Sequence, residues 1–109
     1  MATTYKVLGQ SNPAATTLTT LYTVPASTQT VISTIVVTNL TGTAATFRIA
    51  VRPAGATIAN QHYLAYDVTV GAADSTALTL GITMGATDVL SVYASTTTLA
   101  FSAFGSETA

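Results

Sequence analysis

The stretch that decides the fold is residues 30–39, with the sequence TVISTIVVTN. Val, Ile and Thr fill almost every position of this stretch, and such β-branched residues favour extended backbone over helix. Apolar side chains occur at both odd and even positions, so both faces of the strand should be covered, as in the middle of a buried sheet. We therefore expect residues 30–39 to form the central strand of a β-sheet protein.

The segments on either side of this stretch alternate between apolar and polar residues with the period of two that a strand requires. In residues 45–51, for example, Phe47, Ile49 and Val51 share one face. Turn residues interrupt the alternation at short intervals, which is typical of an all-β sandwich or barrel. We expect no helix and eight short strands, at residues 4–8, 18–24, 30–39, 45–51, 62–70, 76–84, 89–94 and 98–104.

The chain has 109 residues, a length that suits one domain. The predicted fold is all-β: a single antiparallel β-sandwich over residues 1–109, of jelly-roll or Ig-like type. Residues 1–14 form a candidate extended N-terminal arm, which could add a strand to the exposed sheet edge of a neighbour. Residues 105–109 are expected to be loose unless a neighbour holds them.

Composition narrows the class of protein. Hydrophobic residues make up 49% of the chain and charged residues only 6%, with a net charge of −1 and 24 threonines. Disordered chains combine low hydrophobicity with high net charge, so this chain should fold. Its surface must consist of hydroxyls, small apolar groups and backbone, which favours lasting contact with other subunits. We expect a homo-oligomer, a dimer or a trimer, because uncharged strand edges tend to pair.

Several partners and locations are not expected. Three Lys and Arg residues are too few for ordinary DNA binding, so nucleic acid is not an expected partner. The polar start of the sequence lacks the apolar region of a secretory signal, and no apolar run is long enough for a membrane helix. Cysteine is absent, so neither disulfides nor thiolate metal sites contribute.

Catalytic groups are scarce. His62 is the only histidine, and a catalytic base needs a nucleophile and an orienting carboxylate. Asp67 lies five positions further on and should point to the opposite face of the same strand. Asp74 and Asp88 precede expected strands, where Asp commonly bonds the backbone of its own turn. We therefore expect no catalytic residue, no cofactor, no metal ligand and no enzymatic activity.

Two arginines are the one set of charged residues that the strand pattern places together on a defined face. Arg48 and Arg52 lie on the same face of the strand at residues 45–51, facing either an acidic partner or Asp67 across the sheet, and we favour pairing with Asp67. The tyrosines could stack on sugars, but aromatic residues on sheets more often belong to a core or a subunit interface. The candidate residues for a partner interface are Arg48, Arg52, His62 and Tyr63.

Four strand and turn segments of this chain resemble the small virion structural proteins of tailed bacteriophages, especially those of cyanobacterial phages. The resemblance extends over nearly the whole chain and rests on strand and turn sequences rather than on chemical motifs. The segments are TLYTVPA at 20–26, STIVVTN at 33–39, TFRIAVRPAG at 46–55 and DVLSVYAS at 88–95.

The resemblance implies a non-enzymatic subunit of a virion, made in the host cytoplasm. It favours a decoration or cement protein that binds the major capsid protein on the outside of the shell and stabilises the shell. A neck, tail or baseplate component of the same virion is the close alternative. A carbohydrate- or receptor-binding β module remains a third interpretation, which would need an exposed aromatic residue beside Asp, Asn or Gln in a groove.

Overall fold

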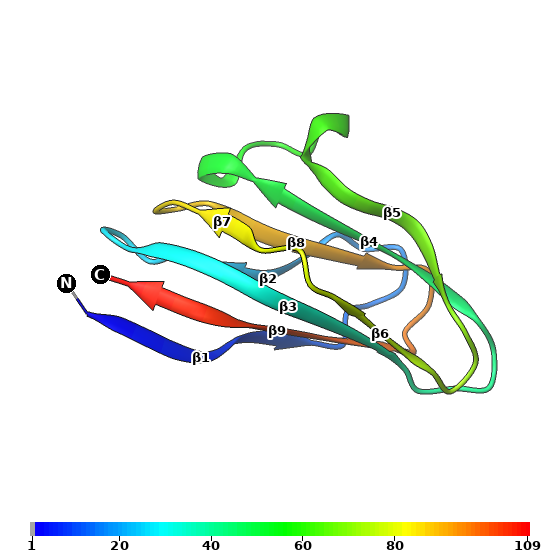
Figure 1. The fold of residues 1–109 in the computed structure, drawn as a ribbon. Helices are drawn as coiled ribbons and strands as arrows, with labels where there is room; N and C mark the ends of the chain where they lie inside the picture. Colours follow the sequence, from blue (N-terminus) through cyan, green and yellow to red (C-terminus); the bar gives the residue numbers. More distant parts are fainter. Residues whose placement is uncertain (1) are drawn as a thin grey trace.

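The structure, a computed structural model, describes residues 2–109 (Figure 1). Within this range the chain forms nine strands and two short 3-10 turns, and no helix is long and apolar enough to cross a membrane. The strands are β1 (Thr3–Ser11), β2 (Thr19–Thr23), β3 (Gln29–Asn39), β4 (Ala45–Arg52), β5 (Tyr63–Val70), β6 (Ser75–Leu78), β7 (Ile82–Met84), β8 (Val89–Ala94) and β9 (Leu99–Thr108), and the turns are η1 (Pro53–Gly55) and η2 (Asn60–His62).

The strands form two antiparallel sheets around one hydrophobic core. One sheet has the order β1-β9-β3-β6, with β7 also paired to β3, and the other has the order β2-β8-β4-β5. Figure 1 shows β1, β9 and β3 side by side, with the two chain ends together. Phe47 of β4 and Phe101 of β9 meet edge to face across the core, with 6.1 Å between ring centroids. The predicted all-β, two-layered class is therefore confirmed.

Strand β3 is central to its sheet, as predicted, because β9 pairs with one side of it and β6 and β7 with the other. Ile32, Ile35 and Val37 are buried on its inner face. Val31 on the outer face is exposed, so the expectation that both faces of this strand are covered is wrong for the single chain. The β-branched residues of the outer face support the extended backbone without contributing to the core.

The predicted strand at residues 76–84 is two strands instead of one. The chain leaves the sheet after Leu78 and returns at Ile82, and Leu80 between them is exposed. Gly81 has φ +64°, a left-handed conformation that most residues avoid and glycine adopts freely. The alternation of Leu78, Leu80, Ile82 and Met84 therefore does not continue across this break.

Both ends of the chain are more ordered than the sequence predicts. Residues 3–11 of the expected arm form β1, which pairs with β9 of the same chain. Gly9 does not end this strand but lies at a bulge, where an ideal Cβ would be 2.2 Å from the carbonyl oxygen of Leu21. Residues 105–108, expected to be loose, belong to β9 and lie between β1 and β3.

Truncating Phe47 should destabilise the fold strongly, because its ring is fully buried and contacts Phe101. We expect Phe47→Ala to lower the free energy of unfolding by about 3–5 kcal/mol in chemical denaturation. Leu40, which is 62% exposed, provides the control, and Leu40→Ala should change stability by less than about 0.5 kcal/mol. Equal effects of the two variants would contradict this assignment of the core.

Candidate functional site

Arg48 lies on the outer face of the β2-β8-β4-β5 sheet, between two tyrosine rings. It is directly opposite Tyr93 of β8, and its guanidinium carbon is 4.3 Å from the centroid of that ring. The same carbon is 4.0 Å from the ring centroid of Tyr66 on β5. Both distances are well within the range of cation–π attraction, so the two rings hold the guanidinium in one place.

A bulge in β5 brings the counter-charge to Arg48. The register changes from Phe47 opposite Val68 to Ile49 opposite Ala65, so Tyr66 and Asp67 both face Arg48. Asp67 has φ +52°, a conformation that Asp tolerates better than most residues. The bulge also leaves Tyr66 on the outer face while Val68 turns inward, although simple alternation along the strand at residues 62–70 would place both on one face.

The ion pair of Arg48 and Asp67 is bidentate. Arg48 Nε donates to Asp67 Oδ1 at 2.7 Å, and Nη2 donates to Oδ2 at 3.3 Å. Hydrogen bonding to Asp67 raises the pKa of Arg48 further above its usual value, so the guanidinium stays charged. The predicted pairing of Arg48 with Asp67 is therefore confirmed, and the positive charge is neutralised within the chain.

Tyr63 completes this surface. Its ring meets the Tyr66 ring edge to face, with centroids 5.0 Å apart and an interplanar angle of 88°. Together with Asn60 the two tyrosines line an open hollow of about 360 Å³. We call the set of five side chains on this outer face the arginine–tyrosine face: Arg48, Tyr63, Tyr66, Asp67 and Tyr93.

The other two predicted interface residues, Arg52 and His62, have local structural roles. Arg52 Nε donates to Ser91 Oγ at 3.2 Å, and its Nη1 donates to the carbonyl oxygen of Ala56 at 3.0 Å. His62 Nδ1 accepts the backbone N–H of Ala59 at 3.0 Å. The expected pairing of Arg52 with Asp67 is thus wrong, because Arg52 instead fastens the loop after β4 to the sheet.

The remaining aspartates have the turn roles that the sequence predicts. Asp74 Oδ1 accepts the N–H of Ser75 at 2.8 Å, and Asp88 Oδ2 accepts the N–H of Gly85 at 2.9 Å. Asp88 Oδ1 also accepts the N–H of Ala54 at 2.9 Å, which holds the turn η1 against the start of β8. Among residues 2–109, His and acidic side chains do not gather in a group that could hold a metal ion.

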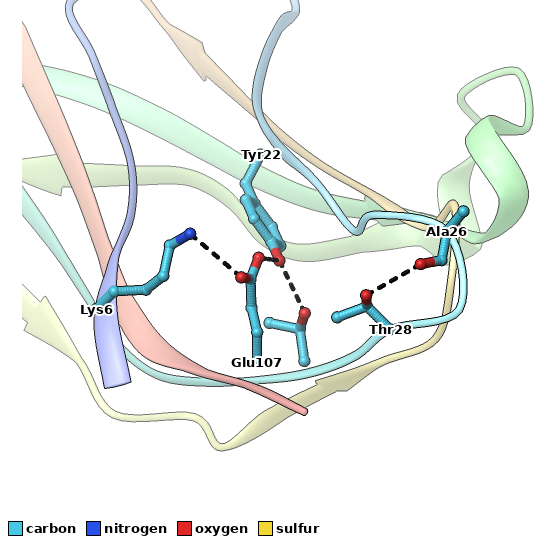
Figure 2. Close-up of polar contacts among 6 residues, drawn as sticks. Lys6, Tyr22, Ala26, Thr28 and Glu107 are labelled. Carbon is cyan, nitrogen blue, oxygen red and sulfur yellow. Dashed lines mark hydrogen bonds and ion pairs between the residues drawn. The ribbon is translucent and has the colours of Figure 1, made fainter. Parts of the chain in front are cut away.

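A second polar cluster lies between the sheets, and sequence reasoning missed it (Figure 2). Tyr22 of β2 is largely buried, and its hydroxyl donates to Glu107 Oε2 on β9. The same hydroxyl oxygen is 2.8 Å from Thr30 Oγ1 on β3. Lys6 Nζ of β1 donates to Glu107 Oε1 at 3.2 Å. Side chains from four strands therefore form one network, which we call the inter-sheet clamp: Lys6, Tyr22, Thr30 and Glu107.

The inter-sheet clamp shifts the acidity of two of its members. Burial, followed by the hydrogen bond to Glu107, raises the pKa of Tyr22 from 10.0 to about 12. The hydrogen bond from Tyr22, followed by that from Lys6, lowers the pKa of Glu107 below its usual 4.5. At neutral pH the cluster thus holds a neutral phenol and an ionised carboxylate, both fully engaged in contacts between strands. The geometry supports a structural role in joining the two sheets.

Comparison with known proteins provides no relative from which to transfer a function. No family model matches the chain, and neither a curated protein nor a solved structure matches it.

The raised pKa of Tyr22 predicts a loss of stability at alkaline pH. Between pH 10 and about 12 the unfolded chain releases the Tyr22 proton, whereas the folded chain retains it. The free energy of unfolding should therefore fall as the pH rises through this range, by up to about 1.4 kcal/mol per pH unit.

Denaturant titrations at several pH values, beside the ultraviolet absorbance of tyrosinate, measure this slope. Tyr22→Phe is the comparison, because it removes the hydroxyl and keeps the ring. Between pH 10 and 12 the free energy of unfolding should fall less steeply with pH in Tyr22→Phe than in the wild-type chain, because the contribution of the Tyr22 hydroxyl is missing. Identical slopes in the two proteins would show that Tyr22 titrates as it does in the unfolded chain.

Proposed function

We propose that this chain is a non-catalytic structural subunit of a tailed-phage virion, and that it binds the outside of the capsid as a decoration or cement protein. The observation that carries this proposal is the arginine–tyrosine face, an ordered and partly exposed surface suited to a protein partner. The resemblance of the strand and turn segments to phage virion proteins gives the class of particle. A neck, tail or baseplate position is the alternative within the same particle.

The strand pairing supports a jelly roll as the fold type within this proposal. The first strand pairs with the last, β2 pairs with β8, β3 pairs with β6 and β7, and β4 pairs with β5. A long antiparallel hairpin that wraps into two sheets has this nested order. Jelly rolls occur in viral capsid and lectin domains, a likeness of fold that raises the expectation of binding without assigning a ligand.

The chemistry of the arginine–tyrosine face suits a protein interface. Tyr and Arg are enriched among the residues that dominate binding energy at such interfaces. Tyr66 is 57% exposed, and Arg48 and Tyr63 hold its ring from two directions. A side chain that is already ordered loses little conformational entropy on binding.

The charge balance of this face favours apolar and aromatic contact over long-range attraction. Asp67 neutralises Arg48 within the face, and the whole chain has a net charge of −1. A neutralised guanidinium can be covered by a partner while it keeps its hydrogen bonds to Asp67. A subunit that covers many equivalent sites in this way stabilises the assembled shell by mass action.

A copy count in purified particles tests the function directly. Quantitative mass spectrometry of the virion should find the chain in numbers on the order of hundreds, as a shell component requires. About 3–18 copies would instead indicate the neck, tail or baseplate, given the closed symmetries of those parts. Absence of the chain from purified virions would overturn the proposal as a whole.

Binding to particles that lack the chain should depend on Tyr66 and resist salt. We expect Tyr66→Ala to weaken binding by at least about 2 kcal/mol, which is roughly 30-fold. Leu40→Ala, a change at an exposed residue outside the face, should leave binding nearly unchanged. Wild-type protein should stay bound at about 1 M salt, where the Debye length is about 3 Å. Complete release in salt would show that charge, and not the aromatic surface, holds the contact.

One observation favours a second function, that of a carbohydrate- or receptor-binding module. Asn60 lies beside Tyr63 and Tyr66 in one open hollow, so an amide and two aromatic rings are available to a sugar. A glycan array would detect such binding, and Asn60→Ala should abolish it without affecting attachment to particles. An array without a bound glycan would remove this alternative.

A further inference from the structure

Strand β1 is a free edge of its sheet. In the part of the chain that the structure describes, β1 pairs with β9 on one side and no strand pairs with its other side. A register shift between Val7 and Gly9 interrupts the strand, and beyond it Gly9 packs one face of β1 against the backbone of Leu21 in β2. The first half, residues 3–7, lies beyond this contact and carries exposed side chains.

The backbone pattern identifies the groups at this free edge. Ala2 and Ala109 exchange both of their backbone hydrogen bonds, each 3.0 Å long. Hydrogen-bonded and non-hydrogen-bonded pairs alternate along an antiparallel ladder, so Thr4 and Lys6 also bond to β9. The residues between them direct their N–H and C=O groups away from β9, and these residues are Thr3, Tyr5 and Val7.

The other sheet edges are less suited to adding a strand. In β5 the bulge at Asp67 interrupts the edge, and a bulge of this kind commonly prevents edge-to-edge pairing. The edge formed by β6 and β7 is broken at residues 79–81. Strand β2 has five residues and a register shift of its own. The segment at residues 3–7 is the longest regular run among these edges.

The side chains along this segment are apolar and exposed. Tyr5 is 83% exposed and Val7 is 48% exposed. They line an open hollow of about 500 Å³ on the outer face of the sheet, together with Val31 and Phe104. The only charged group of the segment, Lys6, is already paired with Glu107. Charge therefore does little to keep a second strand away.

We propose that two copies of this chain associate through their β1 strands, antiparallel and about a two-fold axis, with Tyr5 opposite Tyr5 of the second copy. In this register Thr3 lies opposite Val7, and Thr4 lies opposite Lys6. The two sheets become one continuous sheet, and the outward N–H and C=O groups of Thr3, Tyr5 and Val7 gain partners. A two-fold contact of this kind is closed, so association stops at the dimer.

Only this register gives backbone hydrogen-bond partners to all three outward-facing residues of the segment. In a two-fold antiparallel pair, each outward-facing residue must lie opposite another outward-facing residue. One residue of β1 therefore lies opposite its own copy, and the register is centred on that residue. Centring on Lys6 places two ammonium groups directly opposite each other, which is unfavourable. Centring on Thr4 places Thr3 opposite Tyr5, but it leaves the outward N–H and C=O groups of Val7 without a partner in the segment. Centring on Tyr5 pairs all three and brings the two tyrosine rings together, a favourable cross-strand pair.

The dimer does not rest on the proposed function. The arginine–tyrosine face lies on β4, β5 and β8 of the other sheet, and β5 is at the edge of that sheet farthest from β2. Association through β1 thus leaves two copies of this face available to a partner. A monomeric mass in solution would leave the expected copy count in virions unchanged. Absence of the chain from virions would likewise leave the expected dimer in solution unchanged.

Single cysteine variants test the register, because the chain contains no cysteine. In a hydrogen-bonded antiparallel pair the Cα atoms are about 5.5 Å apart, within the range of about 4.4–6.8 Å that a disulfide needs. Tyr5→Cys should therefore form a disulfide-linked dimer in a glutathione redox buffer. Val7→Cys is the matched control, because its two copies lie four residues apart along the strands, or about 13 Å.

A mixture of Tyr5→Cys and Val7→Cys chains distinguishes the register centred on Lys6, because that register places Tyr5 opposite Val7 and the test keeps both Lys6 side chains. Disulfide linkage between the two variants in preference to Tyr5→Cys with itself, or a yield for Val7→Cys alone that equals that of Tyr5→Cys, would overturn the proposed register. Circular dichroism of each variant shows whether it keeps the fold, which is expected because Tyr5 and Val7 are exposed.

The mass in solution tests the dimer without relying on a cysteine. Light scattering of the wild-type chain should approach the mass of two chains as concentration rises. Tyr5→Lys, which places two charges opposite each other, should shift the mass to one chain, whereas Tyr5→Phe should remain a dimer. A mass of one chain or three chains for the wild type, up to its highest soluble concentration, would overturn the proposal.

Discussion

The edge-to-face contact between Phe47 and Phe101 joins the two sheets, and much of the structure depends on it. With 6% charged residues and no cysteine, apolar packing between the sheets must provide most of the stability. Phe101 lies on β9, the strand that runs between β1 and β3. The same strand supplies Glu107 to the inter-sheet clamp, so the position of β9 determines both the core and the clamp. It also leaves β1 at the edge.

Strand periodicity predicted most of this architecture. The central place of β3 and the inward face of Phe47 and Ile49 follow from β-branched content and alternation, because these depend on local sequence. The bulge at Asp67 could not be predicted in this way. Apolar and polar residues alternate through Tyr66 and Asp67 without interruption, so the sequence does not show where the two faces exchange.

The candidate site was predicted in part for a similar reason. Pairing of Arg48 with Asp67 could be inferred because opposite charges on neighbouring strands attract, and few other charges compete. The clamp could not be inferred, because Tyr22 and Glu107 are 85 residues apart and Tyr22 has the pattern of a core residue. Arg52 carries the same charge as Arg48 on the same strand face, but only the three-dimensional path of the loop shows that it binds Ser91 and Ala56.

The arginine–tyrosine face is the surface that we propose meets the particle. Hydroxyl-radical footprinting with mass spectrometry measures it directly, because tyrosine side chains are oxidised when they are exposed to solvent. In particle-bound protein, compared with free protein at the same concentration, Tyr63, Tyr66 and Tyr93 should become protected. Unchanged oxidation of these three tyrosines on binding would contradict the account and place the contact elsewhere on the chain.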